Sequence, residues 1–249
     1  MIDKAPSTDV RNVRLPPVTA RGLNIQKVMP GPPKRLSVLV YSPPGGGKTF
    51  FAGTFPNPLF IDCQGGMLTV RNKGVSAVAP EDYNDLIQCT IWENVKDFDT
   101  IVLDTATEAA RLVTEFTTKQ SGHELATLPD WMQIIERVRQ LLRKLLDLPM
   151  HVVVTAEEGF HKDEDTGKMT YGPSLPGKLF GEAGALFDCV FHIRSKADLQ
   201  KHTVTRLLLT QPDGMYAQAK DRISLPGYPG LEKLEVPDFK VIWDKLSKS

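Results

Sequence analysis

The chain is poor in the residues that build disulfide-stapled, metal-stabilised and membrane proteins. Its 249 residues hold three cysteines and five histidines, and neither set has the spacing of metal ligands. Three scattered cysteines are too few for a disulfide framework. No apolar run approaches the ~20 residues that a membrane-spanning helix needs. Prolines and charges break residues 1–35, so a signal-peptide core is missing there. We therefore expect a cytoplasmic protein with no membrane partner.

The chain also lacks net charge, since 30 acidic residues balance 30 basic ones. Bulk attraction to a polyanion is thereby excluded, and any nucleic-acid site must be a local patch. The hydrophobic content of 41% is enough to bury the core of one α/β domain, which we place at residues 36–249.

Residues 1–35 are distinct from the rest of the chain because they hold six prolines and seven basic residues against two acidic ones. This composition predicts an extended basic arm without its own core. Two interpretations stay open: a solvated tail, or a segment that docks on a neighbouring subunit or on a nucleic-acid backbone.

A phosphate-binding loop is the clearest motif. The apolar run 36–41 predicts a strand, Ser42 to Thr49 reads S-P-P-G-G-G-K-T, and the residues that follow predict the start of a helix. Such a loop offers backbone N–H groups to phosphate oxygens, with Lys48 reaching the outer phosphates and the Thr49 hydroxyl holding Mg²⁺. Ser42 departs from the pattern G-x-x-x-x-G-K-[ST], which has glycine there. The expected nucleotide-binding residues are Pro44, Gly45, Gly46, Gly47, Lys48, Thr49 and Phe50.

Polar residues follow three further apolar runs. The run 58–62 leads into Gln64, the run 100–103 ends in Asp104, and the run 151–155 leads into Glu157 and Glu158. Asp104 has the form of a second magnesium-binding motif, a carboxylate held rigidly at a strand end. A polar group after the run 151–155 can sense the terminal phosphate or orient water.

Other patterns place the remaining elements. Apolar stripes predict helices at 106–118 and 131–148, with Asp130 as the N-cap of the second. Mixed helical periodicity covers 81–97, a short strand is expected at 75–79, and a short helix at 179–187 leads into a strand at 188–193. Strands at 203–210 and 215–219 are expected to form a hairpin that turns at 211–214. A final helix is expected at 239–246.

Residues 159–178 predict a long loop, because glycines interrupt them and no apolar periodicity is present. Acidic residues in and beside this segment outnumber its lysines, which disfavours DNA. Stacking of Phe160 or Tyr171 on single strands nevertheless stays open.

Lys220 and Arg222 lie one residue apart, so on a strand both project to the same side. They are either an ordinary exposed basic pair or a finger that reaches a neighbouring subunit's phosphates.

The order of these motifs over about residues 36–246 resembles the RecA-like P-loop ATPases, and among them the compact phage-encoded ATPases associated with single-strand annealing. The resemblance implies a mostly parallel central sheet flanked by helices, with a C-terminal antiparallel hairpin. It also implies ATP and Mg²⁺ as cofactors and a homo-oligomer, either ring or filament. By similarity Asp104 assists Mg²⁺, Glu157 senses phosphate, and Lys220 and Arg222 match a K-x-R finger inserted into the next subunit's site. The resemblance places DNA contacts in the loop at Phe160, Lys162, Lys168, Tyr171 and Lys178.

One departure concerns the attack on the γ-phosphate. RecA-like enzymes carry a water-activating glutamate where this chain has Gln64, and an amide orients water but takes no proton. Slow hydrolysis, or a base supplied by Glu157 or Glu158, is implied. The catalytic candidates are therefore Lys48, Asp104, Gln64, Glu157, Lys220 and Arg222.

Two functions follow as expectations. The first is a Mg²⁺-dependent ATPase that acts on single-stranded DNA in phage-type recombination or replication, with other phage recombination or replication proteins as further partners and the cytoplasm of a bacterial host as its location. The second is an assembly protein that ATP controls, with little hydrolysis and no direct DNA role.

Overall fold

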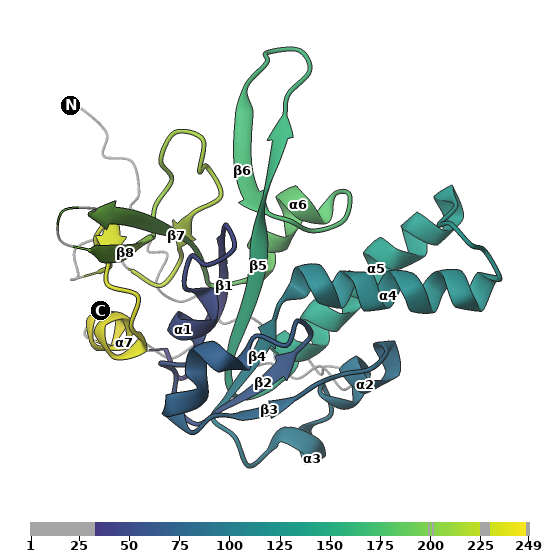
Figure 1. Ribbon diagram of the computed structural model, residues 1–249, viewed down its shortest axis with the longest axis horizontal. Coiled ribbons are helices and arrows are strands. Elements are labelled where there is room, and N and C mark those ends of the chain that lie inside the picture. The colour runs from purple at the N-terminus through teal and green to yellow at the C-terminus, as the bar shows by residue number, and fades with distance from the viewer. Residues whose placement is uncertain (1–32, 199, 201, 225–229, 248–249) are drawn as a thin grey trace, which may run out of the picture. The chain divides into compact units, whose positions relative to one another are not determined.

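The computed structural model describes residues 33–198, 200, 202–224 and 230–247 (Figure 1). The arm predicted for residues 1–35 therefore lies, up to residue 32, outside the described residues. Within the described part of the chain, no helix is long and apolar enough to cross a membrane.

A mostly parallel ten-stranded sheet forms the centre, in the order β10-β8-β7-β1-β5-β4-β2-β3, with β6 paired to β5 and β9 to β7. The strands from β7 to β3 in this order are parallel, whereas β8 and β10 continue the sheet antiparallel. The predicted α/β fold class with antiparallel C-terminal strands is thus confirmed. The strands are β1 (Ser37–Ser42), β2 (Pro58–Asp62), β3 (Ser76–Val78), β4 (Thr100–Asp104), β5 (His151–Lys162), β6 (Met169–Pro173), β7 (Cys189–Asp198), β8 (Thr203–Leu209), β9 (Lys220–Asp221) and β10 (Leu234–Glu235).

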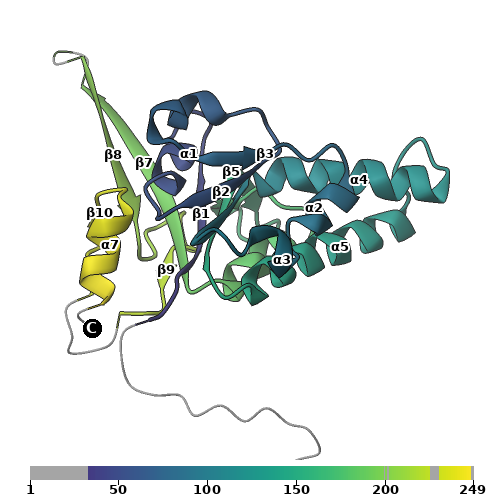
Figure 2. The same cartoon turned by 90° about the horizontal axis from the view of Figure 1, so that it is seen from below.

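Helices cover both faces of this sheet, which is why β2 and β4 are buried along their whole length. One apolar cluster joins the sheet to α4 (Ala106–Ser121) and α5 (Leu128–Asp147), which lie side by side in Figure 2. The other cluster joins it to α1 (Lys48–Ala52) and α7 (Phe239–Leu246). The remaining helical segments are η2 (Met67–Lys73), α2 (Tyr83–Gln88), α3 (Trp92–Val95), α6 (Leu179–Glu182) and η3 (Ala183–Leu186).

Helix α5 begins earlier than predicted, and Asp130 is not its N-cap. Thr127 is the N-cap, and Asp130 is the third helical residue, whose carboxylate accepts from the Thr127 N–H at 2.8 Å. Such a capping box satisfies donors at the start of a helix. Pro129 fits in the first turn, where its missing N–H costs no hydrogen bond.

The segment predicted as a loop at 159–178 contains instead the end of β5 and all of β6. These strands pair antiparallel from Glu158–Pro173 to Lys162–Met169, and the hairpin extends beyond the parallel sheet (Figure 1). The end of β5 is exposed while β6 is partly to fully buried, and each strand of this narrow ribbon contains a glycine, Gly159 and Gly172, so the apolar periodicity that marks buried strands was missing here.

The predicted pairing of 203–210 with 215–219 is also wrong. β8 pairs with β7, in a register that sets Ser195 opposite Arg206. The segment 215–219 is no strand, because tertiary contacts hold it instead. The Tyr216 ring stacks between those of His192 and Tyr171, and the Asp213 carboxylate pairs with Arg194.

Candidate nucleotide site

The glycine-rich loop connects the end of β1 to the start of α1. Gly47, the residue before α1, has φ 103°, a left-handed conformation that favours glycine. Gly46 makes room for Ser42, since a Cβ on Gly46 would lie 2.1 Å from the Ser42 Oγ. The serine that replaces the usual first glycine is therefore accommodated by the absence of a side chain four residues later.

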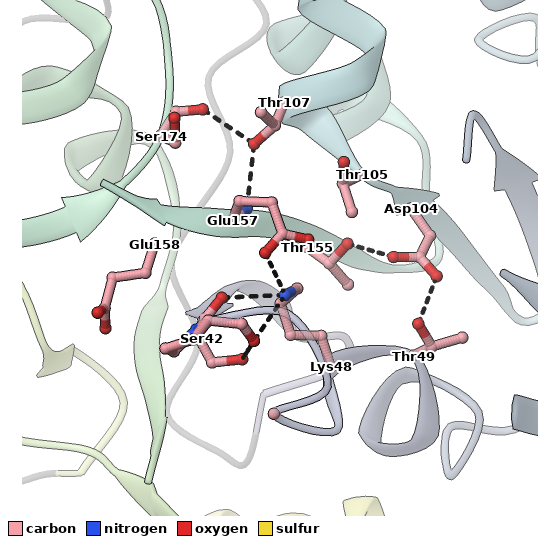
Figure 3. Close-up of polar contacts among 12 residues, drawn as sticks. Ser42, Lys48, Thr49, Asp104, Thr105, Thr107, Thr155, Glu157, Glu158 and Ser174 are labelled. Carbon is pink, nitrogen blue, oxygen red and sulfur yellow. Dashed lines mark hydrogen bonds and ion pairs between the residues drawn. The ribbon is translucent and has the colours of Figure 1, made fainter.

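Lys48 is buried inside the loop, with its side chain 6% exposed. Its ammonium donates to the Ser42 carbonyl at 3.0 Å and forms an ion pair with the Glu157 carboxylate at 3.0 Å (Figure 3). The Glu157 backbone is fixed as well, because its N–H donates to the Thr107 hydroxyl and its carbonyl accepts from the Ser174 N–H. Strand β5 thus contacts the glycine-rich loop through the Lys48–Glu157 ion pair.

Asp104 lies beside Thr49, as the sequence predicted for a magnesium site. The Thr49 hydroxyl donates to one Asp104 carboxylate oxygen at 2.8 Å, and the Thr155 hydroxyl donates to the other at 2.5 Å (Figure 3). Burial raises the pKa of Asp104, and these two hydrogen bonds oppose the rise.

These oxygen donors fit Mg²⁺. A hydroxyl and one carboxylate suit a cation that keeps several waters and takes the rest of its ligands from phosphates. Among the described residues no cluster of three or more His, Cys, Asp or Glu could hold a metal alone. Thr49 and Asp104 would therefore hold Mg²⁺ together with the phosphates of a nucleotide.

Asp62 at the end of β2 and Gln64 two residues later have different surroundings. Asp62, at the end of β2, accepts from the backbone N–H groups of Gln64, Gly65 and Gly66, so its carboxylate serves the turn. Gln64 lines a cavity of about 490 Å³ together with Lys48 and Thr49. This position is suited to orienting a water molecule in that cavity.

Glu157 and Glu158 face different cavities because adjacent strand residues point to opposite faces. Glu157 lines the 490 Å³ cavity. Glu158 lines another one, of about 710 Å³, where its carboxylate lies 2.7 Å from the His192 Nε2. Burial lowers the pKa of His192 to about 4 and raises that of Glu158. Of the two alternative bases, only Glu157 thus adjoins Lys48 and Thr49.

Lys220 and Arg222 do not join this site within one chain. β9 pairs with Cys189 and Val190 at the start of β7, whereas the loop follows the end of β1, which is parallel to β7. Arg222 donates from its guanidinium to the Ala185 carbonyl at 3.1 Å.

Four of the five residues considered for DNA contact belong to the β5–β6 hairpin. Phe160 is 66% exposed on β5, and Lys162 pairs with Met169 near the free end of the hairpin. Lys168 directly precedes β6 and is exposed. Tyr171 stacks on Tyr216, and Lys178 precedes α6. Phe160 and Tyr171 are thus directly opposite each other on the hairpin, Lys168 adjoins Met169, the partner of Lys162, and only Lys178 lies outside the hairpin.

Arg206 is a site residue that sequence reasoning missed. It lies on β8 and lines the 490 Å³ cavity, although 157 positions separate it from Thr49. No local motif surrounds it, and only the pairing of β8 with β7 brings it to the loop.

Residues 34–223 match the AAA domain family. No curated protein matches the chain. Among solved structures, a KaiC-like protein from the hyperthermophilic archaeon Pyrococcus horikoshii OT3 is similar at 16% identity and TM-score 0.44, over 70% of this chain and 77% of that one. The RadB recombinase is similar at 14% identity and TM-score 0.43, over 70% of this chain and 87% of that one.

Proposed function

We propose, from the premise that this chain belongs to the AAA domain family, that it is a Mg²⁺-dependent ATPase acting on single-stranded DNA in phage-type recombination or replication. The observation that carries the ATPase part is one cavity that holds Lys48, Thr49 and Asp104 beside a glycine-rich loop. A buried ammonium, the backbone amides of a glycine-rich loop and a hydroxyl–carboxylate pair are the groups that phosphates and Mg²⁺ require.

Residues that line this cavity have different roles in the proposed hydrolysis of ATP. Lys48 leaves Glu157 and binds the outer phosphates, while Thr49 and Asp104 would hold Mg²⁺. Mg²⁺ held there would supply positive charge beside the phosphates. Gln64 orients the attacking water, and Glu157, released from Lys48, is the carboxylate available to accept its proton. Because Gln64 cannot take that proton, we expect slow turnover.

The active site of this proposal is shared between subunits of a ring or filament. Its support is the position of Lys220 and Arg222, which lie away from their own chain's loop. Each subunit then supplies these two cations to its neighbour's phosphates. The β5–β6 hairpin, with Phe160 exposed and lysines near its free end, is the DNA-binding element of the proposal.

ATP hydrolysis with and without single-stranded DNA tests this function. Lys48→Ala should abolish nucleotide binding, whereas Arg222→Ala should leave binding intact and remove hydrolysis. Lys240→Ala, on α7 outside the residues that line the cavity, is the matched control and should turn over like the wild type. Absence of ATP binding would refute the ATPase assignment. Intact ATP hydrolysis by Arg222→Ala would refute the role of Arg222 as a finger, and a hydrolysis rate that single-stranded DNA does not change would refute the DNA role.

A nucleotide-controlled assembly protein is the second candidate. Gln64 favours it, because the strand-end carboxylate nearest to Gln64, that of Asp62, is engaged by three backbone amides. Light scattering with ATP, ADP and no nucleotide, run beside a DNA-binding assay, separates the two candidates. Assemblies that form with ATP and ignore DNA would favour the second.

A further inference from the structure

Arg206 is a cation beside the glycine-rich loop, and no sequence motif predicts its position there. Its Nη2 lies 3.5 Å from the Gly45 carbonyl oxygen, and its Cδ lies 2.8 Å from the point that a Cβ on Gly47 would occupy. The absence of a side chain at Gly47 therefore lets the arginine lie against the loop. Ser195, opposite Arg206 in the β7–β8 register, adds a long contact of 3.5 Å from its hydroxyl to the Gly46 carbonyl.

The charge of Arg206 has no counterion among the described residues, where its one polar contact is with Gly45. Other cations nearby are neutralised: Lys48 pairs with Glu157, and Arg194 pairs with Asp213. An unpaired guanidinium that faces a cavity lined by backbone amides and a lysine creates a site for an anion.

We propose that Arg206 binds a phosphate group of the nucleotide held by its own chain, so that two cations from different elements, Lys48 of α1 and Arg206 of β8, hold the phosphates. This inference rests on the nucleotide binding proposed above. Guanidinium forks bind phosphate oxygens through paired, charge-assisted hydrogen bonds. The role differs from that of Lys220 and Arg222, which serve a neighbour's site in the proposed function.

The control comes from the same hairpin. Lys196 is exposed and pairs with Thr205, next to the Ser195–Arg206 pair. Because adjacent strand residues point to opposite faces, the side chain of Lys196 projects from the face opposite to that of Arg206. Lys196→Ala removes the same charge as Arg206→Ala, but at a side chain that lines the 710 Å³ cavity and not the 490 Å³ cavity.

Isothermal titration calorimetry with ADP and Mg²⁺ tests the proposal, with circular dichroism melting curves to confirm that each variant folds. Arg206→Ala should raise the Kd for ADP about tenfold or more, Arg206→Lys should raise it less, and Lys196→Ala should stay within about twofold of the wild type. The gap between Arg206→Ala and wild type should narrow from about 50 mM to about 500 mM NaCl, since salt screens exposed charges.

Two results would overturn the proposal: an ADP affinity in Arg206→Ala equal to that of the wild type, or a loss of affinity that salt does not change, which would indicate a packing role. If the wild-type chain itself binds no ADP, the proposed function fails together with this inference. Tight wild-type binding with an unaffected Arg206→Ala variant removes the inference alone.

Discussion

The Lys48–Glu157 ion pair predicts that a single substitution makes the loop bind nucleotide more tightly. The Lys48 ammonium cannot make its full ion pair with Glu157 and with a phosphate at the same time. The Glu157 carboxylate therefore competes with the nucleotide phosphate for Lys48. Glu157→Gln keeps the size of the side chain and removes its charge. The variant should therefore bind ADP more tightly than the wild type.

The magnitude follows from the geometry. Unit charges 3.0 Å apart attract by about 5.5 kcal/mol at an effective dielectric constant of about 20. Most of this is lost to desolvation and solvent screening, because the Glu157 side chain is 22% exposed, which leaves about 1–2 kcal/mol. The Kd for ADP should thus fall by about tenfold. The ligand-free variant should also melt at a lower temperature, since Lys48 keeps only carbonyl acceptors.

The assay is calorimetric titration with ADP, together with melting curves with and without ADP. Glu158→Gln is the matched control, because it removes a carboxylate one residue away that faces the other cavity and contacts His192. It should leave the Kd for ADP within about twofold of the wild type. An unchanged or weaker ADP affinity in folded Glu157→Gln would refute the competition between carboxylate and phosphate.

Three further predictions concern the loop, the metal residues and pH. Gly46→Ala should destabilise the loop and weaken ADP binding, because its Cβ would lie 2.1 Å from the Ser42 Oγ, and adding Ser42→Gly should restore binding in calorimetry. Asp104→Asn should leave ADP binding without Mg²⁺ nearly unchanged and remove most of the gain that Mg²⁺ gives, whereas an equal gain in both proteins would contradict the assignment. Burial lowers the pKa of His192 from 6.5 to about 4, so the unfolded chain takes up the proton first, and this contribution to stability is present above about pH 6.5 and lost as pH falls toward 4. Urea unfolding at both ends of this window should show a smaller loss for His192→Gln than for the wild type.

The elements that sequence predicted well are those whose burial is encoded locally. The run 100–103 and its Asp104 became β4, fully buried, and the stripe at 239–246 became α7 with the predicted bounds. The position of the glycine-rich loop between β1 and α1 was equally predictable, because the residues of this motif are neighbours in the chain. These features depend on one segment at a time, so a pattern within that segment suffices to predict them.

Features that depend on distant segments escaped prediction. The β5–β6 hairpin is a narrow ribbon with a glycine in each strand, Gly159 and Gly172, so it carries no clear apolar alternation. The segment around Tyr216 is held by ring stacking on His192 and Tyr171 instead of by strand pairing. Arg206 reaches the loop only through the register of β8 on β7. The opposite orientation of Glu157 and Glu158 was implied by strand geometry, but which of them faces the loop required the sheet order.

The continuity of β5 places the hairpin on the same strand as a residue of the candidate nucleotide site. Glu157, which holds Lys48, belongs to the same unbroken strand as Lys162 near the free end of the hairpin. At about 3.3 Å per residue the arm between them is about 16 Å long, so a turn of about 10° at Glu157 displaces the far end by about 3 Å. The hydrogen bonds of the Glu157 backbone to Thr107 and Ser174 thus set the direction in which the free end of the hairpin projects.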